Sequence, residues 1–185
     1  MSRIIALLIA AMLINTAALA KSTEFSFLGI GAGDNIETVK QKLDLAEQKG
    51  NIVSHPRSAS SQCKEGGCFI NGLKLGDLML QYVTITIIDG DVISIGAGVM
   101  PVRSASFLDA LIGKYGKADK VNTFDMQNGY GAKFKDKLYE WHFKDGKMIF
   151  TSSGNPANRN GDLMEFTTKK HSDKFKNQKK AKDAM

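Results

Sequence analysis

Residues 139–150 read Tyr-Glu-Trp-His-Phe-Lys-Asp-Gly-Lys-Met-Ile-Phe, and this stretch decides the fold. Aromatic residues alternate with polar ones as far as the Asp-Gly pair at 145–146, and apolar residues follow it. An Asp-Gly pair between two such segments is a strong signal for a tight β-turn. The stretch therefore predicts a β-hairpin whose inward face carries Tyr139, Trp141 and Phe143, while His142 faces outward.

A second hairpin is predicted earlier in the chain. From Tyr82 to Ile87, tyrosine and threonine alternate with valine and isoleucine, and an Asp-Gly pair at 89–90 leads into an apolar run at 92–95. The alternation of period two indicates a half-buried strand, and the Asp-Gly pair indicates a short turn to a second strand. Further strands are predicted at 24–30, 120–126, 130–135 and 162–168. A loop rich in Asn, Gly and Pro, at 153–161, precedes the last of these.

A helical pattern precedes the first hairpin. Asp34 or Asn35 is a suitable N-cap, Asp34 and Glu37 have the spacing of a capping box, and Gly50 ends the segment. Its apolar stripe has helical spacing and comprises Ile36, Val39, Leu43 and Ala46.

A second helical pattern lies between the hairpins, with Ser104 or Ser106 as its N-cap and Gly116 as its C-cap. Its apolar face comprises Phe107, Leu108, Leu111, Ile112 and Tyr115. The order helix, hairpin, helix, hairpin is that of a degenerate tandem repeat. We expect an α+β fold with two helices packed on a mainly antiparallel sheet.

The chain has two cysteines, Cys63 and Cys68, separated by Lys-Glu-Gly-Gly. The two glycines give the short loop the freedom to bring both cysteines together. A redox centre is typically Cys-x-x-Cys, and a zinc site needs two further ligands. We therefore expect one structural disulfide and no metal site.

The N-terminus has the three parts of a secretory signal peptide: Arg3, an apolar run from Ile4 to Leu13, and Ala18-Leu-Ala20. The run is shorter than the about 20 residues that span a bilayer. We expect cleavage after Ala20, a mature chain that is not transmembrane, and a periplasmic location. The predicted organisation is a signal peptide at 1–20, one domain at 21–168 and a tail at 169–185.

The tail is strongly basic, whereas residues 21–168 hold equal numbers of basic and acidic residues. Few of its residues are apolar, so we expect it to be disordered or weakly helical. It is a candidate contact for anionic lipid or lipopolysaccharide, and equally a solubilising terminus. The neutral body argues against nucleic-acid binding. The tail lysines are Lys169, Lys170, Lys174, Lys176, Lys179, Lys180 and Lys182.

The segment Gly29-Ile-Gly-Ala-Gly-Asp-Asn-Ile-Glu-Thr-Val39, together with the helix–hairpin order, resembles small exported proteins with the tandem α/β fold of beta-lactamase inhibitor proteins. Outer-membrane-assembly lipoproteins have a similar unit. The resemblance implies a non-enzymatic protein that binds other proteins through a sheet surface or loops. This chain departs from the lipoproteins because it lacks the lipid-bearing cysteine.

Enzyme and cofactor signatures are absent from the sequence. It contains no Gly-x-Ser-x-Gly, His-Glu-x-x-His or phosphate-loop motif. The histidines, His55, His142 and His171, have no nucleophile at a recognisable spacing. The residues 158–162 are faintly calcium-like but lack the closing glutamate, so a polar loop is the simpler interpretation. We expect no cofactor and no catalytic residue.

The favoured hypothesis is a non-enzymatic module that binds another envelope protein, such as an inhibitor or immunity factor. Its candidate recognition segment is the loop at 50–72, with Arg57, Lys64 and Glu65 as contact residues, because a disulfide there lowers the entropic cost of binding. One alternative is an envelope-surface or lipopolysaccharide-associated protein that acts through the lysine tail. The other is a small periplasmic hydrolase around His55 or His142.

The first prediction concerns processing. The exported protein should begin at Lys21, because the segment ending at Ala20 matches a signal-peptidase site. Mass spectrometry of the purified exported chain measures this directly. An intact Met1 on a membrane-embedded species would contradict the export argument.

Overall fold

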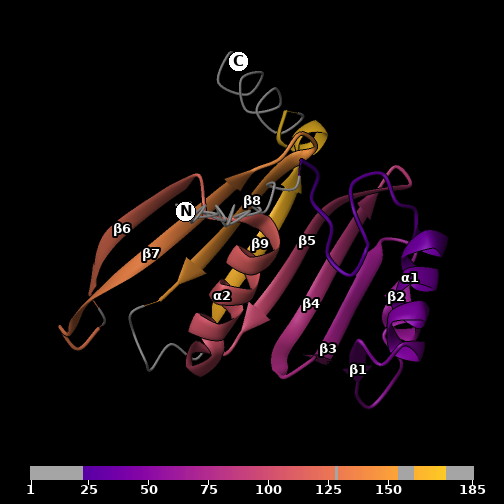
Figure 1. Cartoon of the computed structure of the whole chain (residues 1–185), viewed down its shortest axis with the longest axis horizontal. Helices are drawn as coiled ribbons and strands as arrows, with labels where there is room; N and C mark the ends of the chain where they lie inside the picture. Colours follow the sequence, from indigo (N-terminus) through magenta and orange to yellow (C-terminus); the bar gives the residue numbers. More distant parts are fainter. Residues whose placement is uncertain (1–22, 128, 154–160, 174–185) are drawn as a thin grey trace, which may run out of the picture.

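The computed structural model of the chain describes residues 23–127, 129–153 and 161–173 (Figure 1). The predicted signal peptide, residues 174–185 of the tail and most of the loop at 153–161 lie outside the described residues. In the described ranges, every helix is too short or too polar to cross a membrane.

The described residues form an α+β structure with a 9-stranded antiparallel sheet, which confirms the predicted fold class. The path through the sheet is β1-β3-β4-β5-β9-β8-β7-β6, and β2 pairs with β3 beside it. The elements are α1 (Ile36–Gln48), β1 (Ile52–Ser54), η1 (Ser60–Gln62), β2 (Cys63–Lys64), β3 (Gly67–Leu75), β4 (Leu78–Ile88), β5 (Asp91–Val99), η2 (Pro101–Arg103), α2 (Ser104–Tyr115), β6 (Lys120–Gln127), β7 (Lys133–His142), β8 (Gly146–Ser152) and β9 (Asp162–Thr168).

The two halves of the chain share one layout. In the first half α1 is followed by short outer strands and then by the meander β3-β4-β5; in the second half α2 is followed by the outer strand β6 and the meander β7-β8-β9. The last strands of the two meanders, β5 and β9, pair with each other at the centre of the sheet, where Ile95 lies opposite Phe166. Both helices lie on one side of this sheet (Figure 1). The layout agrees with the predicted tandem arrangement.

The hydrophobic core fills the space between the helices and the sheet face beneath them. The aromatic residues Trp141, Phe150 and Phe166 are fully buried there. The indole Nε1 of Trp141 donates a hydrogen bond of 2.9 Å to the carbonyl of Gly116, the residue that ends α2. The predicted inward face of the second hairpin is therefore confirmed, and its tryptophan also fixes the end of a helix.

The N-terminus of α1 differs from the predicted capping box. Asn35 is the N-cap, and its side-chain oxygen accepts a hydrogen bond from the backbone N–H of Thr38. Asp34 instead forms an ion pair of 2.7 Å with Lys42, two turns along the helix. The capping box predicted between Asp34 and Glu37 is wrong. The side chain of Asn35, one residue after Asp34, already accepts the hydrogen bond from the backbone N–H of Thr38 in the first turn.

The N-terminus of α2 also differs from prediction. A 3₁₀ turn at Pro101–Arg103 leads directly into the helix, so neither Ser104 nor Ser106 is the N-cap. The Ser104 side chain is buried and its hydroxyl lies 3.1 Å from that of Ser152 on β8. The predicted C-cap is confirmed: Gly116 has φ +79° and donates its N–H to the last turn of the helix.

Three predicted segments need correction, and the strand predicted at 130–135 is in fact the start of β7, which runs from Lys133 to His142. Residues 24–30 are not a strand, because Leu28 adopts a φ of +56° and the chain closes a tight turn with one isolated bridge between Phe27 and Ile30. Residues 50–72 are not one loop, since they contain β1, β2 and most of β3. Of the two glycines between the cysteines, Gly67 lies in β3, where it permits a close approach to β4, whereas Gly66 lies just before the strand with open space around it.

The second prediction concerns the inward face of β7. Trp141→Ala should destabilise the protein by about 3–5 kcal/mol, because a fully buried aromatic residue and its hydrogen bond are lost. His142→Ala should change stability by less than about 0.5 kcal/mol, since the exposed imidazole makes surface contacts only. Urea unfolding of both variants measures the difference. Equal losses would mean that the strand faces are misassigned.

Candidate functional site

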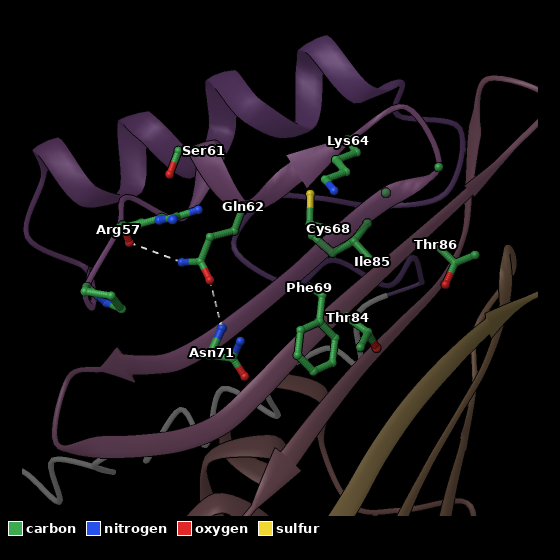
Figure 2. Close-up of a pocket in the computed structure, with 13 residues that line it drawn as sticks. Arg57, Ser61, Gln62, Lys64, Cys68, Phe69, Asn71, Thr84, Ile85 and Thr86 are labelled. Carbon is green, nitrogen blue, oxygen red and sulfur yellow. Dashed lines mark hydrogen bonds between the residues drawn. The ribbon is translucent and has the colours of Figure 1, made fainter.

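A groove of about 880 Å³ lies on the sheet face that the helices leave uncovered (Figure 2). Its floor is formed by the outward residues of β3 and β4, and its wall by the segment between β1 and β2. The lining residues are Pro56, Arg57, Ser61, Gln62, Lys64, Gly66, Gly67, Cys68, Phe69, Asn71, Thr84, Ile85 and Thr86.

An exposed aromatic residue, Phe69, forms part of the floor of the groove, and the half-buried Tyr82 lies beside it, outside the lining. Phe69 on β3 is 55% exposed and stacks on Tyr82 of β4, with ring centroids 5.9 Å apart and an interplanar angle of 13°. Tyr82 in turn lies over Gly98 of β5, where an added Cβ would be 2.4 Å from the tyrosine ring. The glycine therefore lets Tyr82 lie flat on the sheet, and Tyr82 supports Phe69 from the side.

The wall of the groove is held by side chains from two directions. The amide of Gln62 donates to the carbonyl of Arg57 (3.1 Å), and its oxygen accepts from the N–H of Asn71 on β3 (3.2 Å), as Figure 2 shows. From the other side, the carboxylate of Glu47 on α1 accepts from the N–H of Ala59 (3.0 Å). The segment that carries Arg57 is thus fastened to both the sheet and the first helix.

The predicted disulfide is present and closes the end of the groove. Cys63 on β2 and Cys68 on β3 are directly opposite each other in the strand register and are bonded. The hairpin that they form lies on β4, because the N–H of Ile87 donates to the carbonyl of Gly66 (3.0 Å). At Gly67, with φ +128°, a Cβ would lie 1.9 Å from the carbonyl oxygen of Ile85, so only glycine permits this approach.

The groove is positively charged. Arg57 and Lys64 both line it, and none of its described lining residues is an aspartate or a glutamate. Among the described residues, neither cation has a carboxylate within 4.0 Å. Glu65, the third predicted contact, lies elsewhere: it lines a separate hollow of about 460 Å³ beside Glu37 and Asp89. The structure therefore brings two of the three predicted contact residues into one site.

The described part of the tail is attached to the body. Residues 169–173 are helical, the N–H of Lys169 donates to the carbonyl of Asp145, and Lys170 forms an ion pair of 3.0 Å with Asp91. The hydrogen bond to Asp91 raises the pKa of Lys170. The other predicted lipid-contact residues, Lys174, Lys176, Lys179, Lys180 and Lys182, lie outside the described residues.

The histidines are placed apart from one another. His55 is exposed next to the wall of the groove, while His142 lies at the far end of β7. The imidazole of His142 contacts the carboxylates of Glu140 (2.9 Å) and Asp119 (3.5 Å), so its described partners are acids. In the described ranges, no three His, Cys, Asp or Glu residues are grouped to hold a metal ion.

The aromatic floor was missed by the sequence reasoning. The alternation at 82–87 identifies Tyr82 and Thr84 as outward residues, but it does not show that this face is hollowed. Phe69 lay in the segment predicted as a loop, so its pairing opposite Thr84 could not be anticipated. A strand prediction for 67–75 would have placed all three residues on one face.

The third prediction concerns the hairpin that closes the groove. Gly67→Ala should destabilise the protein by about 2–4 kcal/mol, because the new Cβ overlaps β4 and the backbone is strained. Gly76→Ala is the matched control: its φ is also positive, but nothing lies within 4 Å of the added Cβ. It should cost only about 1 kcal/mol. Chemical denaturation distinguishes the two, and equal costs would mean that the hairpin does not approach β4.

Comparison of the chain with models of protein families, with curated proteins and with solved structures finds no match. The arrangement of this groove is therefore the basis for a functional argument.

Proposed function

We propose that this chain is a non-enzymatic, exported protein-binding module of the bacterial envelope, of the inhibitor or immunity-factor kind. The groove beside the disulfide hairpin is its recognition surface. The observation that carries the proposal is the combination of Arg57, Lys64 and the exposed Phe69 around one hollow whose described lining has no acidic residue. The signal peptide predicted at 1–20 supports a periplasmic location for this activity.

The residue types in the groove are those that contribute most to protein–protein binding. Arginine and aromatic residues are enriched among hot spots, where they lie at the centre of a contact. Phe69 exposes 55% of its surface although it is supported by Tyr82, so it offers a large apolar contact at a fixed position. The threonines Thr84 and Thr86 supply hydroxyls along the same floor. An exposed aromatic within a polar surface favours a protein partner.

The site is arranged before any partner arrives. Gln62 and Glu47 hold the wall, the disulfide closes the hairpin, and the floor belongs to the central sheet. Binding to such a surface orders few additional residues, which reduces the entropic cost of association. A fixed recognition surface is what an inhibitor needs in order to bind tightly.

The charge of the groove specifies the partner's chemistry. Two cations without described carboxylate partners attract an acidic segment, and complementary charge increases both the association rate and selectivity. The partner should therefore present an aspartate or glutamate to Arg57 or Lys64, and an apolar side chain to Phe69. Arginine pairs with a carboxylate through two parallel hydrogen bonds, which makes Arg57 the stronger of the two contacts.

The fourth prediction tests this surface. The chain 21–185 is immobilised, envelope proteins are captured and identified, and the affinity of each purified partner is then measured. Arg57→Glu and Lys64→Glu should each weaken binding more than tenfold, since an attraction becomes a repulsion. Lys74→Glu is the matched control, because it reverses an exposed charge on β3 outside the groove lining.

The outcomes separate the competing functions. Partners that respond to Arg57→Glu and Lys64→Glu but not to Lys74→Glu support the groove. If binding is instead lost when the chain ends after Thr168, and weakens steeply with salt, the lysine tail is the binding element. Partners that are insensitive to every one of these changes would refute the groove as a recognition surface.

A further inference from the structure

A further hollow, of about 470 Å³, lies on the other side of the sheet from the recognition groove. It is lined by apolar side chains from three places: Phe107 and Leu111 of α2, Phe27 and Leu28 of the turn before α1, and Leu75 and Leu78 at the β3–β4 turn. Its volume is within the range of about 300–1,000 Å³ found for small-molecule sites. None of the lining residues that the structure describes carries a carboxylate, and the charged one among them is Lys114.

Lys114 is held at the rim of this hollow. Its ammonium donates to the carbonyl of Ser26 (2.5 Å) and lies 5.1 Å from the centre of the Tyr115 ring. An ammonium has three N–H donors, so this hydrogen bond leaves two for another acceptor. Among the described residues, no carboxylate lies within 4.0 Å of it. Burial lowers the pKa of Lys114, and an anion beside it would counteract that effect.

The composition of the lining discriminates between classes of ligand. A peptide carries a backbone donor and acceptor at every residue, and these groups lose hydrogen bonds when they enter an apolar space. Besides Lys114, the described lining has two polar side chains, Asn51 and Tyr115, and the Tyr115 hydroxyl already donates to the carbonyl of Ser26 (2.6 Å). An acyl chain has no polar groups to satisfy, and one terminal carboxylate matches one ammonium.

We propose that this hollow binds a fatty acid, with the acyl chain along α2 and the carboxylate at Lys114. The site is independent of the proposed protein-binding function, because its lining and that of the groove share no residue and lie on opposite faces of the sheet. An envelope protein with two such sites carries a lipid-derived ligand on one face and its partner on the other.

The fifth prediction uses the chain 21–185 and saturated fatty acids at concentrations below micelle formation. Calorimetry should detect binding of dodecanoate, and affinity should increase about fourfold for each added methylene from octanoate to dodecanoate. Dodecanol, which has the same chain without the charge, should bind at least fivefold more weakly than dodecanoate. Absence of dodecanoate binding, or equal binding of the alcohol, would overturn the proposal.

Three variants locate the ligand. Lys114→Met keeps the apolar stem and removes the charge, so it should weaken dodecanoate at least fivefold and leave dodecanol unchanged. Lys117→Met is the matched control, because this exposed lysine lies three residues further on and does not line the hollow. Ala110→Phe places a ring in the hollow from an exposed position of α2 and should weaken both ligands.

Thermal unfolding verifies that each variant is folded before its affinity is compared. If Lys114→Met and Lys117→Met have the same effect, the carboxylate is not bound at Lys114. If Ala110→Phe leaves both affinities unchanged, the ligand binds outside the hollow. Either result refutes the site without affecting the recognition groove.

Discussion

The pairing of β5 with β9 is the interaction on which the rest of the structure depends. Each half of the chain supplies a helix and a three-stranded meander, which is near the lower limit for independent stability. Six consecutive residue pairs between β5 and β9 join the two meanders into one sheet, and the pairs Ile95–Phe166 and Ala97–Met164 place buried residues from both halves under the helices. The core is therefore continuous across the junction, and neither half has to form a sufficient core alone.

The placement of both helices on one side of this sheet determines where its hollows lie. The side beneath the helices carries the core, and the opposite side carries threonines, glycines and the Phe69–Tyr82 pair. The segment between β1 and β2 folds beside that open face and converts a flat surface into a groove. On the helix side, the space between α2 and the β3–β4 turn is incompletely filled, and Lys114 marks its rim. The two sides of the sheet thus carry hollows of different chemistry.

Much of the fold could be predicted because its signals are local. The Asp-Gly turns and the alternation around Trp141 specify both hairpins, and the short spacing of Cys63 and Cys68 predicts their bond. The prediction failed where tertiary packing overrides a local signal. Glycines normally indicate a loop, but Gly67 is required by the approach of one strand to another, so β3 was not recognised.

The candidate site could be predicted only in part. The disulfide predicts a restrained segment that carries Arg57 and Lys64, and both residues line one groove. Glu65 follows Lys64 directly, yet the turn of the hairpin directs it to a different hollow. The stacking of Phe69 on Tyr82 could not be predicted from the sequence. It joins residues of β3 and β4 and depends on Gly98 in β5.

That stacked arrangement ties together positions that are far apart in the chain. Tyr82 can lie flat on the sheet because residue 98 has no side chain. Phe69 in turn has Tyr82 as a stacking partner because the Tyr82 ring lies flat. The effect of a substitution at any one of these three positions therefore depends on which residues occupy the other two. Over evolutionary time the three should therefore change as a linked set, so that aligned descendants of this sequence would show covariation between positions 69, 82 and 98.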